Sequence, residues 1–521
     1  MLFHSPVFLF FFLPVVLGVY LLLERRAPSV LSIGFLALAS LFFYSWWNPF
    51  YLPLLIGSIV FNFTIGRLVS GDFRFRNRYG ALVFGVVANL ALLAAFKYAD
   101  FAIRTIDWFG GAGIPDLGIV LPLAISFYTF QQIAFLVDSY QGKAPIRSFP
   151  AYCLFITFFP HMIAGPIVHH REMMPQFARL IAGNSRTTEE VWHDLAVGFS
   201  MFTIGLVKKV FFADQFAIWA DNAFRAADAG AQLSFAEAWL GTGCFALQIY
   251  LDFSGYTDMA LGLARLFGVK LPLNFNSPYK ASSIIEFWHR WHMTLSRFLR
   301  DYLYFPLGGN RLGKFRQYSN IMIVMLLGGL WHGASWTFVM WGGLHGVYLL
   351  INHGYRALVA RGLPAMRPWA GVLITTVCVL VAWAFFRAET FSGGFNVIKG
   401  MVGFNGIALP LHWEPAFGAK VDALARMGLP IGFAPMTAYS GGVQIAWVVA
   451  GFLAMWFLPN TQEILRRHDP AFETVAAPRG LAAILTWRPS AALGAGFAVA
   501  ALAATFIVLQ GKAGEFIYFQ F

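Results

Sequence analysis

The chain has 521 residues, of which 58% are hydrophobic and 12% charged, and its formal net charge is +12. Soluble domains carry about 25% charged residues, so this composition excludes an ordinary soluble protein. The positive charge requires no nucleic-acid partner, because cytoplasmic loops of membrane proteins collect Lys and Arg that meet anionic lipid. The sequence therefore predicts an all-α polytopic membrane protein whose partner is the lipid bilayer.

Apolar stretches recur from one end of the chain to the other, and most are long enough to cross a bilayer. Some are short or adjacent, which predicts tilted, interfacial or re-entrant helices among about 11 to 13 membrane helices. The first stretch lacks a signal-peptide layout and is interpreted as a retained helix. The candidate spans are residues 6–23, 30–47, 50–66, 80–98, 118–138, 150–168, 195–212, 236–253, 319–333, 335–353, 369–387, 441–459 and 489–509.

Basic residues follow alternate spans in the first part of the chain. Arg25 and Arg26 follow the first span, Arg67 begins the arginine-rich loop after the third, and Lys143 follows the fifth. Because Lys and Arg are enriched in cytoplasmic loops, this pattern predicts an N-terminus on the outer side. The segment 169–193 is too polar to cross and is expected to lie along a surface.

A basic, aromatic segment interrupts the apolar pattern between residues 274 and 317. Its apolar positions recur at intervals of three and four residues, the spacing of one helix face. A basic amphipathic helix of this kind suits the cytoplasmic membrane interface. The positions are Phe287, Trp291, Leu295, Phe298 and Tyr302.

The arginines of this basic segment are candidate ligands for a phosphate-bearing donor. Guanidinium groups bind phosphate in a bidentate geometry, although contact with lipid headgroups is an equally good interpretation of any one of them. The candidates are Arg290, Arg297, Arg300 and Arg311.

Two histidines lie within strongly apolar sequence. His332 occupies the run 325–338, and His345 follows in the next apolar span; glycines flank both. An ionisable side chain at membrane depth is costly unless it faces protein, water or a reaction, and imidazole is suited to proton transfer near neutral pH. His332 and His345 are therefore candidate catalytic residues. The alternative is that each ring hydrogen-bonds a neighbouring carbonyl and only packs helices.

Other residues that carry polar chemistry give weaker signals. His289 and His292 are three residues apart with no carboxylate to complete a ligand set, so neither a metal site nor a bound cofactor is expected. Asp252 and Asp258 end an apolar span and need partners there. We expect structural ion pairs with arginines of the basic segment, and a direct part in substrate binding is the alternative.

The whole chain, 1–521, is expected to form a single membrane domain. Within it, residues 389–440 are rich in Gly and Pro and are expected to form an extramembrane loop. Residues 510–521 form an aromatic tail after the last span. Tyr518 is the only nucleophile of its terminal aromatic run. We expect the tail either to fold into a groove at the outer face or to anchor the chain at the interface.

These motifs together resemble the membrane-bound O-acyltransferase (MBOAT) family, and in particular its bacterial branch that acylates exported polymers. The resemblance is densest over residues 120–350, which it identifies as the catalytic core. The motifs that carry it are Trp331-His332-Gly333, His345, IEFWHRWH (285–292), RDYLY (300–304), LGGNR (307–311), DFSGYTD (252–258), PHMIAGP (160–166), VKKV (207–210) and the terminal YFQF (518–521).

The resemblance implies helices around a central funnel in a bacterial inner membrane. It implies that a cytoplasmic thioester, acetyl-CoA or an acyl-carrier protein, donates the acyl group, that His332 lies where the cavities meet, and that Tyr518 carries the acyl group. Periplasmic acetyltransferase proteins and a polysaccharide biosynthesis complex are the implied partners. Alginate is the favoured polymer, with cellulose and peptidoglycan as alternatives. A proton-coupled transporter with intramembrane histidines is the alternative from another functional class.

Overall fold

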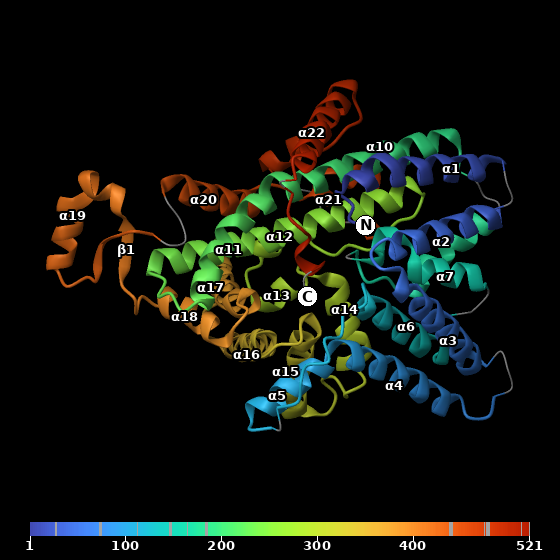
Figure 1. Ribbon diagram of the computed structural model, residues 1–521, viewed down its shortest axis with the longest axis horizontal. Coiled ribbons are helices and arrows are strands. Elements are labelled where there is room, and N and C mark those ends of the chain that lie inside the picture. The colour runs from blue at the N-terminus through green and yellow to red at the C-terminus, as the bar shows by residue number, and fades with distance from the viewer. Residues whose placement is uncertain are drawn as a thin grey trace.

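The computed structural model is helical throughout and confirms the predicted all-α polytopic class (Figure 1). Within the described part of the chain, β-structure is limited to one pair of four-residue strands. The description covers the chain except for residues 27–28, 72–74, 112, 145–147, 164, 183–185, 437–440, 474, 476–479, 512 and 520–521.

The N-terminal helices form one end of the molecule, and the central helices lead from it toward the other end (Figure 1). The N-terminal helices are α1 (Leu13–Arg26), α2 (Ser29–Ser45), α3 (Leu52–Ser70), α4 (Arg78–Lys97), α5 (Ala99–Trp108), α6 (Ile125–Tyr140), α7 (Phe149–Thr157), α8 (Phe159–Met162) and α9 (His170–Ile181). The central helices are α10 (Thr188–Val207), α11 (Asp214–Asp228), α12 (Phe235–Leu266), α13 (Ile284–Trp288), α14 (Met293–Leu299), α15 (Gly313–His332), α16 (Trp336–Val359) and α17 (Pro368–Arg387).

The C-terminal part contains both strands and returns to the centre of the molecule. Its elements are α18 (Phe391–Met401), β1 (Ile407–Pro410), α19 (Glu414–Arg426), β2 (Ile431–Ala434), α20 (Gly442–Phe457), α21 (Thr461–Ile464) and α22 (Ala491–Leu509). Short π-helical turns occur at Phe8–Phe12, Lys208–Ala213 and Arg300–Tyr304. Short 3-10 turns occur at Pro49–Tyr51, Pro278–Lys280, Leu411–Trp413, Arg466–His468, Gly480–Leu485 and Ile517–Phe519.

Six helical stretches of the described residues are long and apolar enough to cross a membrane, and two apolar helices are shorter. The longest helix, α12, packs against α10 and α11, and every residue from Gly241 to Leu266 is buried. A helix that is buried all round belongs to the interior, so α12 forms the axis of the protein. The six stretches are Phe8–Arg26, Pro49–Ser70, Arg78–Lys97, Thr188–Asp228, Pro368–Arg387 and Ala491–Leu509.

The predicted span 150–168 is wrong as a single helix. It divides into α7 and α8 at Phe158, whose backbone is not helical. Pro160 lacks the N–H that would bond to the carbonyl of Ile156, and its ring would clash with that carbonyl in a continuous helix. The span therefore breaks where the proline enters.

The predicted amphipathic helix of the basic segment is also wrong as a continuous helix at the membrane surface. It is divided into α13, α14 and the π-helical turn Arg300–Tyr304, with His292 in a left-handed conformation at φ 41°. The side chains of Phe287, Trp291 and Leu295 are buried in the protein core. Helical periodicity identifies a buried face here, but it does not reveal what covers that face.

The segment 389–440 contains regular structure at the end of the molecule opposite the N-terminal helices (Figure 1). Strands β1 and β2 pair in parallel with Ile407 opposite Ile431, and α19 connects them. Its last four residues, 437–440, lie outside the described residues.

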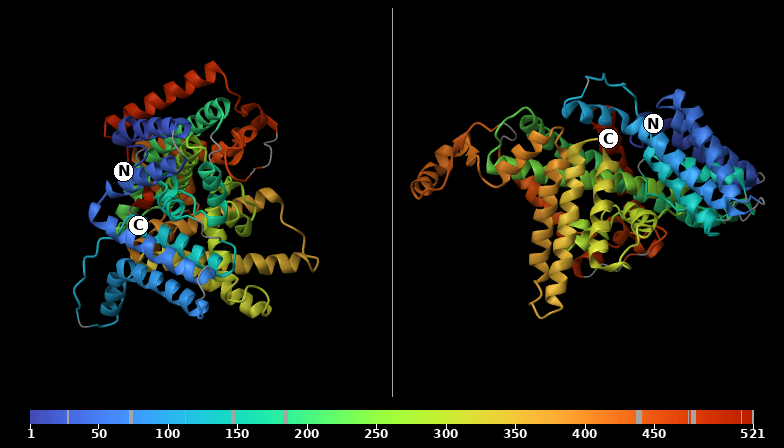
Figure 2. Two further views of the ribbon diagram at one scale, coloured as in Figure 1. Left: turned by 90° about the vertical axis from the view of Figure 1, so that its right-hand side faces the viewer. Right: turned by 90° about the horizontal axis from the view of Figure 1, so that it is seen from below.

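Helices α15 and α16 form a tightly packed hairpin, and α16 continues with α17 into a pair of helices that projects from the rest of the protein (Figure 2). The two helices meet at Gly329 and Gly342, whose Cα atoms lie so close that a Cβ atom on either glycine would approach the other. A Cβ atom on Gly342 would also overlap the carbonyl oxygen of Met325. This close approach fixes the position of the end of α15, where His332 lies.

Replacing Gly342 with Ala is expected to force α15 and α16 apart and to destabilise the protein by about 1–3 kcal/mol, the usual cost of overpacking. The measurement is the thermal midpoint of the purified protein in detergent. Gly354→Ala is the matched control, because the same helix offers open space at Gly354. An unchanged midpoint for Gly342→Ala would contradict the proposed contact.

Candidate active site

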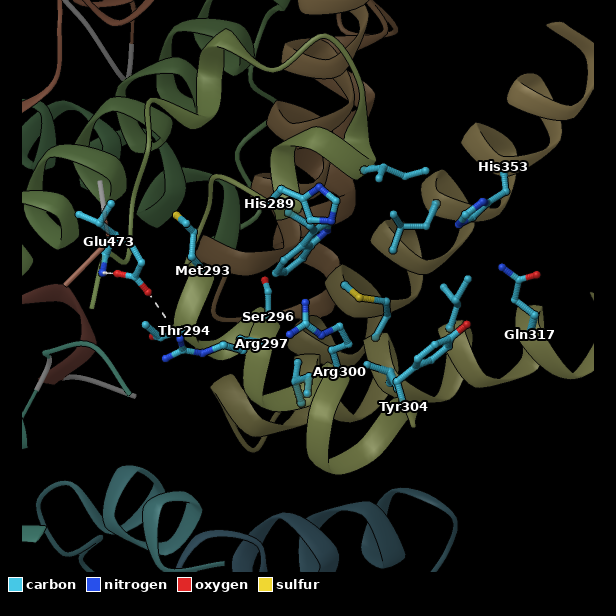
Figure 3. A pocket seen from close by; sticks show the side chains of 18 residues that line it. His289, Met293, Thr294, Ser296, Arg297, Arg300, Tyr304, Gln317, His353 and Glu473 are labelled. Atoms are coloured by element: carbon cyan, nitrogen blue, oxygen red, sulfur yellow. Dashed lines mark hydrogen bonds and ion pairs between the residues drawn. The ribbon is translucent and has the colours of Figure 1, made fainter. Parts of the chain in front are cut away.

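A cavity of about 530 Å³ lies between α13, α14, α15 and α16 (Figure 3). We call it the basic cavity, because Arg297 and Arg300 contribute to its wall while most of its lining is apolar. His353 and Gln317 lie on its far side. An apolar space with guanidinium groups at its wall can hold an extended ligand that ends in phosphate.

The structure brings together two of the four arginines predicted to bind a donor. Arg297 and Arg300 line the basic cavity, whereas Arg290 pairs with Glu286 at 2.8 Å and does not line it. Arg311 is exposed in the turn before α15 and is also absent from the lining. The break between α13 and α14 explains the difference, since it turns Arg290 away from the later arginines.

Arg297 is held in place by acidic residues from two distant segments. Its guanidinium lies 2.7 Å from the Glu172 carboxylate on α9 and 3.5 Å from that of Glu473. Burial raises the pKa of Glu172 above its ordinary value, while the positive charge of Arg297 acts in the opposite direction. These contacts fix the position of one cation at the cavity wall, whereas Arg300, among the described residues, pairs only with its neighbour Asp301 and is more exposed.

A second cavity, of about 180 Å³, has His332 in its wall. We call it the tail cavity, because Tyr518 of the C-terminal tail forms part of its wall. Residues 121–127, from the loop before α6 into its first turn, supply most of the remaining wall, and Lys97 at the end of α4 adds to it. Its lining residues are Trp47, Lys97, Leu121, Pro122, Leu123, Ala124, Ile125, Ser126, Phe127, Ile163, Trp331, His332 and Tyr518.

His332 lies at the C-terminal end of α15 with 3% of its surface exposed. Its ring centroid is 5.7 Å from that of Tyr518 and 5.0 Å from that of Trp341. Within the described residues, its Nδ1 atom is buried and has no hydrogen-bond partner. The predicted histidine and the predicted tyrosine are thus brought together at one cavity, although 186 residues separate them (518 − 332).

His345 packs against the rings of Trp288 and Trp341 and does not lie beside Tyr518. Trp288 donates a hydrogen bond from Nε1 to Nδ1 of His345 at 3.3 Å, and Trp288 also lines the basic cavity. The ring of Trp341 lies 4.9 Å from that of His345 and 5.0 Å from that of His332. His345 is therefore placed to support the wall between the cavities, separated from His332 by an indole.

His292 belongs to the site and is not predicted from the sequence. It is fully buried, and its ring centroid lies 6.4 Å from that of His332. Its Nδ1 lies 3.0 Å from Oδ1 of Asn274, which also accepts a hydrogen bond from the Thr294 hydroxyl at 2.8 Å. Because an amide oxygen only accepts, Nδ1 carries the proton, and Nε2 of the neutral ring is left with its lone pair.

The signal for His292 is hidden by the sequence pattern around it. The apolar periodicity predicts that His292 lies inside a continuous helix. Its spacing of three residues from His289 suggests only a metal ligand pair, which the sequence does not complete. The described residues contain no group of three His, Cys, Asp or Glu side chains that could hold a metal ion. The left-handed backbone that directs this histidine inward has no clear mark in the sequence.

The C-terminal tail is docked by a buried cluster of three charged side chains, which we call the tail clamp: Lys209, Asp214 and Asp252. The Lys209 ammonium lies 2.6 Å from Asp214 and 3.2 Å from Asp252, and it donates to the carbonyl of Glu515 at 3.1 Å. All three side chains are at least nine-tenths buried. The charged groups of the tail clamp therefore interact with one another and with the backbone of the tail.

The carboxylates of the tail clamp also bind the tail backbone. Asp252 accepts a hydrogen bond from the N–H of Ile517 at 2.8 Å, and Asp214 accepts one from the N–H of Gly514 at 3.1 Å. Tyr518 follows directly and packs on Phe253 of α12 with ring centroids 4.5 Å apart. The tail therefore folds back against the protein, and its last residues, 520–521, lie outside the described chain.

The prediction that Asp252 and Asp258 pair with arginines of the basic segment is wrong. Asp252 pairs with Lys209, and Asp258 pairs with Lys208 at 2.6 Å. Asp258 also accepts hydrogen bonds from Thr461 and Gln462 at 2.6 and 2.7 Å. The π-helical turn Lys208–Ala213 places consecutive lysines against α12, nearer than any arginine of the divided basic segment.

Residues 143–389 match the description "MBOAT, membrane-bound O-acyltransferase family". The chain is 43% identical over 438 residues to the peptidoglycan O-acetyltransferase of Helicobacter pylori, covering 78% of this chain and 81% of that protein. It is 40% identical over 440 residues to the "Probable alginate O-acetylase AlgI" of Pseudomonas aeruginosa, covering 83% and 81%. It is 27% identical over 290 residues to the teichoic acid D-alanyltransferase of Bacillus subtilis, covering 54% and 70%.

Asp252→Asn is expected to loosen the tail, because Lys209 then loses one of its two carboxylate partners in the protein interior. Removing one partner of a buried ion pair costs about 3–5 kcal/mol. The measurement is the rate at which a maleimide labels Ile517→Cys, a buried position, after the three native cysteines are replaced by Ala. We expect labelling to accelerate at least ~10-fold.

The matched control is Asp116→Asn, which breaks the exposed pair with Arg104 and leaves the tail untouched. Equal labelling rates in the Asp252 and Asp116 variants would show that the clamp does not hold the tail.

Proposed function

The chain belongs to the membrane-bound O-acyltransferase family, and we propose that it transfers an acetyl group from a cytoplasmic thioester toward an exported polysaccharide. The observation that carries this proposal is that His332 lines one cavity while an earlier part of its own helix, α15, lines the other. His332 lines the tail cavity, while Met325 and Val324 of the same helix line the basic cavity. An acyltransferase that works across a membrane needs a proton acceptor where a donor and an acceptor approach from opposite sides.

We place the thioester donor in the basic cavity. Its apolar lining suits the extended arm that carries the thioester, and Arg297 and Arg300 suit phosphate oxygens. Acetyl-CoA and an acyl-carrier protein share both features. The basic cavity faces the cytoplasm if the arginine-rich loops do, as their charge predicts.

The acceptor in the first step is the hydroxyl of Tyr518 in this proposal. The phenol oxygen attacks the thioester carbonyl, His332 takes the phenol proton, and collapse of the tetrahedral intermediate breaks the carbon–sulfur bond. The thiol leaves with the proton that His332 returns. The product is an acetyl ester on Tyr518, from which a hydroxyl on the outer side takes the acetyl group in a second transfer.

The surroundings of His332 support a base of this kind. Burial among aromatic rings excludes water that would hydrolyse a thioester or an ester. His292 adds a second ring nitrogen with a lone pair, oriented by Asn274. His345, beyond Trp341, supports the wall and its Trp288 side chain at the basic cavity. Because the chain belongs to an acyltransferase family, we do not propose the alternative function of a proton-coupled transporter.

The acceptor polymer is proposed from the relatives. Alginate is the polymer in the name of the Pseudomonas aeruginosa relative, and peptidoglycan is the one in the name of the Helicobacter pylori relative. We propose an exported polysaccharide of this kind, with alginate first, peptidoglycan second and cellulose third. A bacterial inner membrane and periplasmic acetyltransferase partners that receive the acetyl group follow from that choice.

His332→Ala is expected to lower acetyl transfer by about 10²–10⁴-fold, the usual contribution of a general base. The measurement is labelled acetyl on alginate and on peptidoglycan in cells, together with thioester turnover by the purified protein. His412→Ala, an exposed histidine of the segment 389–440, is the control. Normal acetylation by folded His332→Ala protein would show that His332 is not the base.

Tyr518→Phe keeps the ring that packs against Phe253 and His332 but removes the hydroxyl. We expect polymer acetylation to be lost while the protein keeps its thermal midpoint. Mass spectrometry of the C-terminal peptide should find the acetyl label in the parent and not in the variant. Full polymer acetylation by Tyr518→Phe would exclude a carrier role and leave the tail as a structural element.

A further inference from the structure

Lys97, the last residue of α4, reaches from the N-terminal helices to the end of α15. Its ammonium group donates hydrogen bonds to the carbonyl of Trp331, to that of His332 at 3.4 Å and to the Ser126 hydroxyl at 3.5 Å. The neighbouring Tyr98 donates from its hydroxyl to the carbonyl of Leu330 at 3.0 Å. Two consecutive side chains thus bind three consecutive carbonyls at the end of the His332 helix.

The final carbonyls of a helix have no partner within the helix and carry the negative end of its dipole. In α15 the residues that carry two of them, Trp331 and His332, are buried. A cation at this position is favourable to the dipole and satisfies two of the carbonyls directly. Lys97 therefore holds the backbone that carries His332.

Binding these carbonyls requires a hydrogen-bond donor, but it does not require the positive charge of Lys97. No ion pair involves Lys97 anywhere in the described part of the chain; its partners are neutral oxygens and the ring of Trp331, whose centroid lies 5.9 Å from the ammonium nitrogen. Among the described residues, those that line the tail cavity include Lys97 but no carboxylate. The neighbouring Tyr98 shows that a neutral hydroxyl is sufficient to bind a carbonyl here. A partly buried cation without an acidic partner is costly, and such residues mark functional sites.

We propose that Lys97 is a positioning residue for His332 whose positive charge also accelerates acyl transfer at the tail cavity. This inference rests on the proposed function of His332 and Tyr518. Negative charge develops on oxygen as the phenol attacks and the tetrahedral intermediate forms. A fixed cation on the wall of the same cavity stabilises that charge without reorganisation, and low dielectric strengthens the effect.

The test separates the charge of Lys97 from its hydrogen bonds. Lys97→Gln keeps a donor for the α15 carbonyls and removes the charge, whereas Lys97→Arg keeps the charge. Tyr98→Phe is the matched control, because it removes one carbonyl partner from the same helix end and changes no charge. Each purified protein is assayed for kcat and for the KM of the thioester donor, with acetyl-CoA as the probe, or acetylated acyl-carrier protein where acetyl-CoA does not support turnover.

KM reports whether α15 has moved, because Gln317, Ile321 and Met325 of α15 line the basic cavity. We expect Lys97→Gln to lower kcat about 10- to 100-fold with KM unchanged, as loss of one charge-stabilising group does elsewhere. Lys97→Arg should recover part of that loss, and Tyr98→Phe should keep most of the parent kcat.

Three results would overturn the inference: normal kcat in Lys97→Gln, a loss in which KM rises as much as kcat falls, or Lys97→Arg no better than Lys97→Gln. His332→Ala in the same assay separates the two proposals. If His332→Ala is inactive and Lys97→Gln is normal, only the role of Lys97 fails. If His332→Ala is active, the proposed function fails whatever Lys97 does.

Discussion

A helix that ends inside a membrane protein leaves carbonyl groups that lipid cannot satisfy, and the site is built around such an end. Helix α15 stops at His332, and Gly333 leaves the helical conformation. Lys97 and Tyr98 of the α4 end donate hydrogen bonds to the carbonyls that lack a partner within α15. The glycine contact between α15 and α16 fixes the helix from its other face. The histidine is held from two sides before any substrate arrives.

The C-terminal tail solves a related problem with charges instead of a helix cap. Its backbone N–H groups at Gly514 and Ile517 are paired with side-chain carboxylates and not with the backbone of a helix or strand. Asp214 and Asp252 accept hydrogen bonds from those groups, and Lys209 pairs with both carboxylates. A short, mostly aromatic segment can therefore be placed beside His332 with a defined register. Apolar packing alone would permit the aromatic residues to exchange places.

The sequence predicts the parts of this arrangement that depend on composition and local pattern. Apolar stretches predict the helical membrane fold, and a histidine in apolar sequence marks His332. Tyr518 stands out as the nucleophile of an aromatic tail. His292, Lys97 and Lys209 escape prediction, because each gains its importance from segments distant in the chain. Lys97 resembles an ordinary basic residue at the end of a span, where positive charge is common. Pattern reasoning also gives the wrong partners for Asp252 and Asp258, since pairing depends on the unpredicted π-helical turn beside α12.

The break in the basic segment links the two cavities. A continuous helix from Phe287 to Tyr302 would keep its apolar face together and spread its arginines along one side. The left-handed turn at His292 instead sends Arg297 and Arg300 to the basic cavity and directs the His292 ring toward His332. Backbone in this region is unfavourable for a residue with a Cβ atom, so tertiary contacts must maintain it. Asn274 does so: its backbone carbonyl accepts from the N–H of Met293, and its side chain binds His292 and Thr294. The same local strain thus shapes the basic cavity and places a second imidazole near His332.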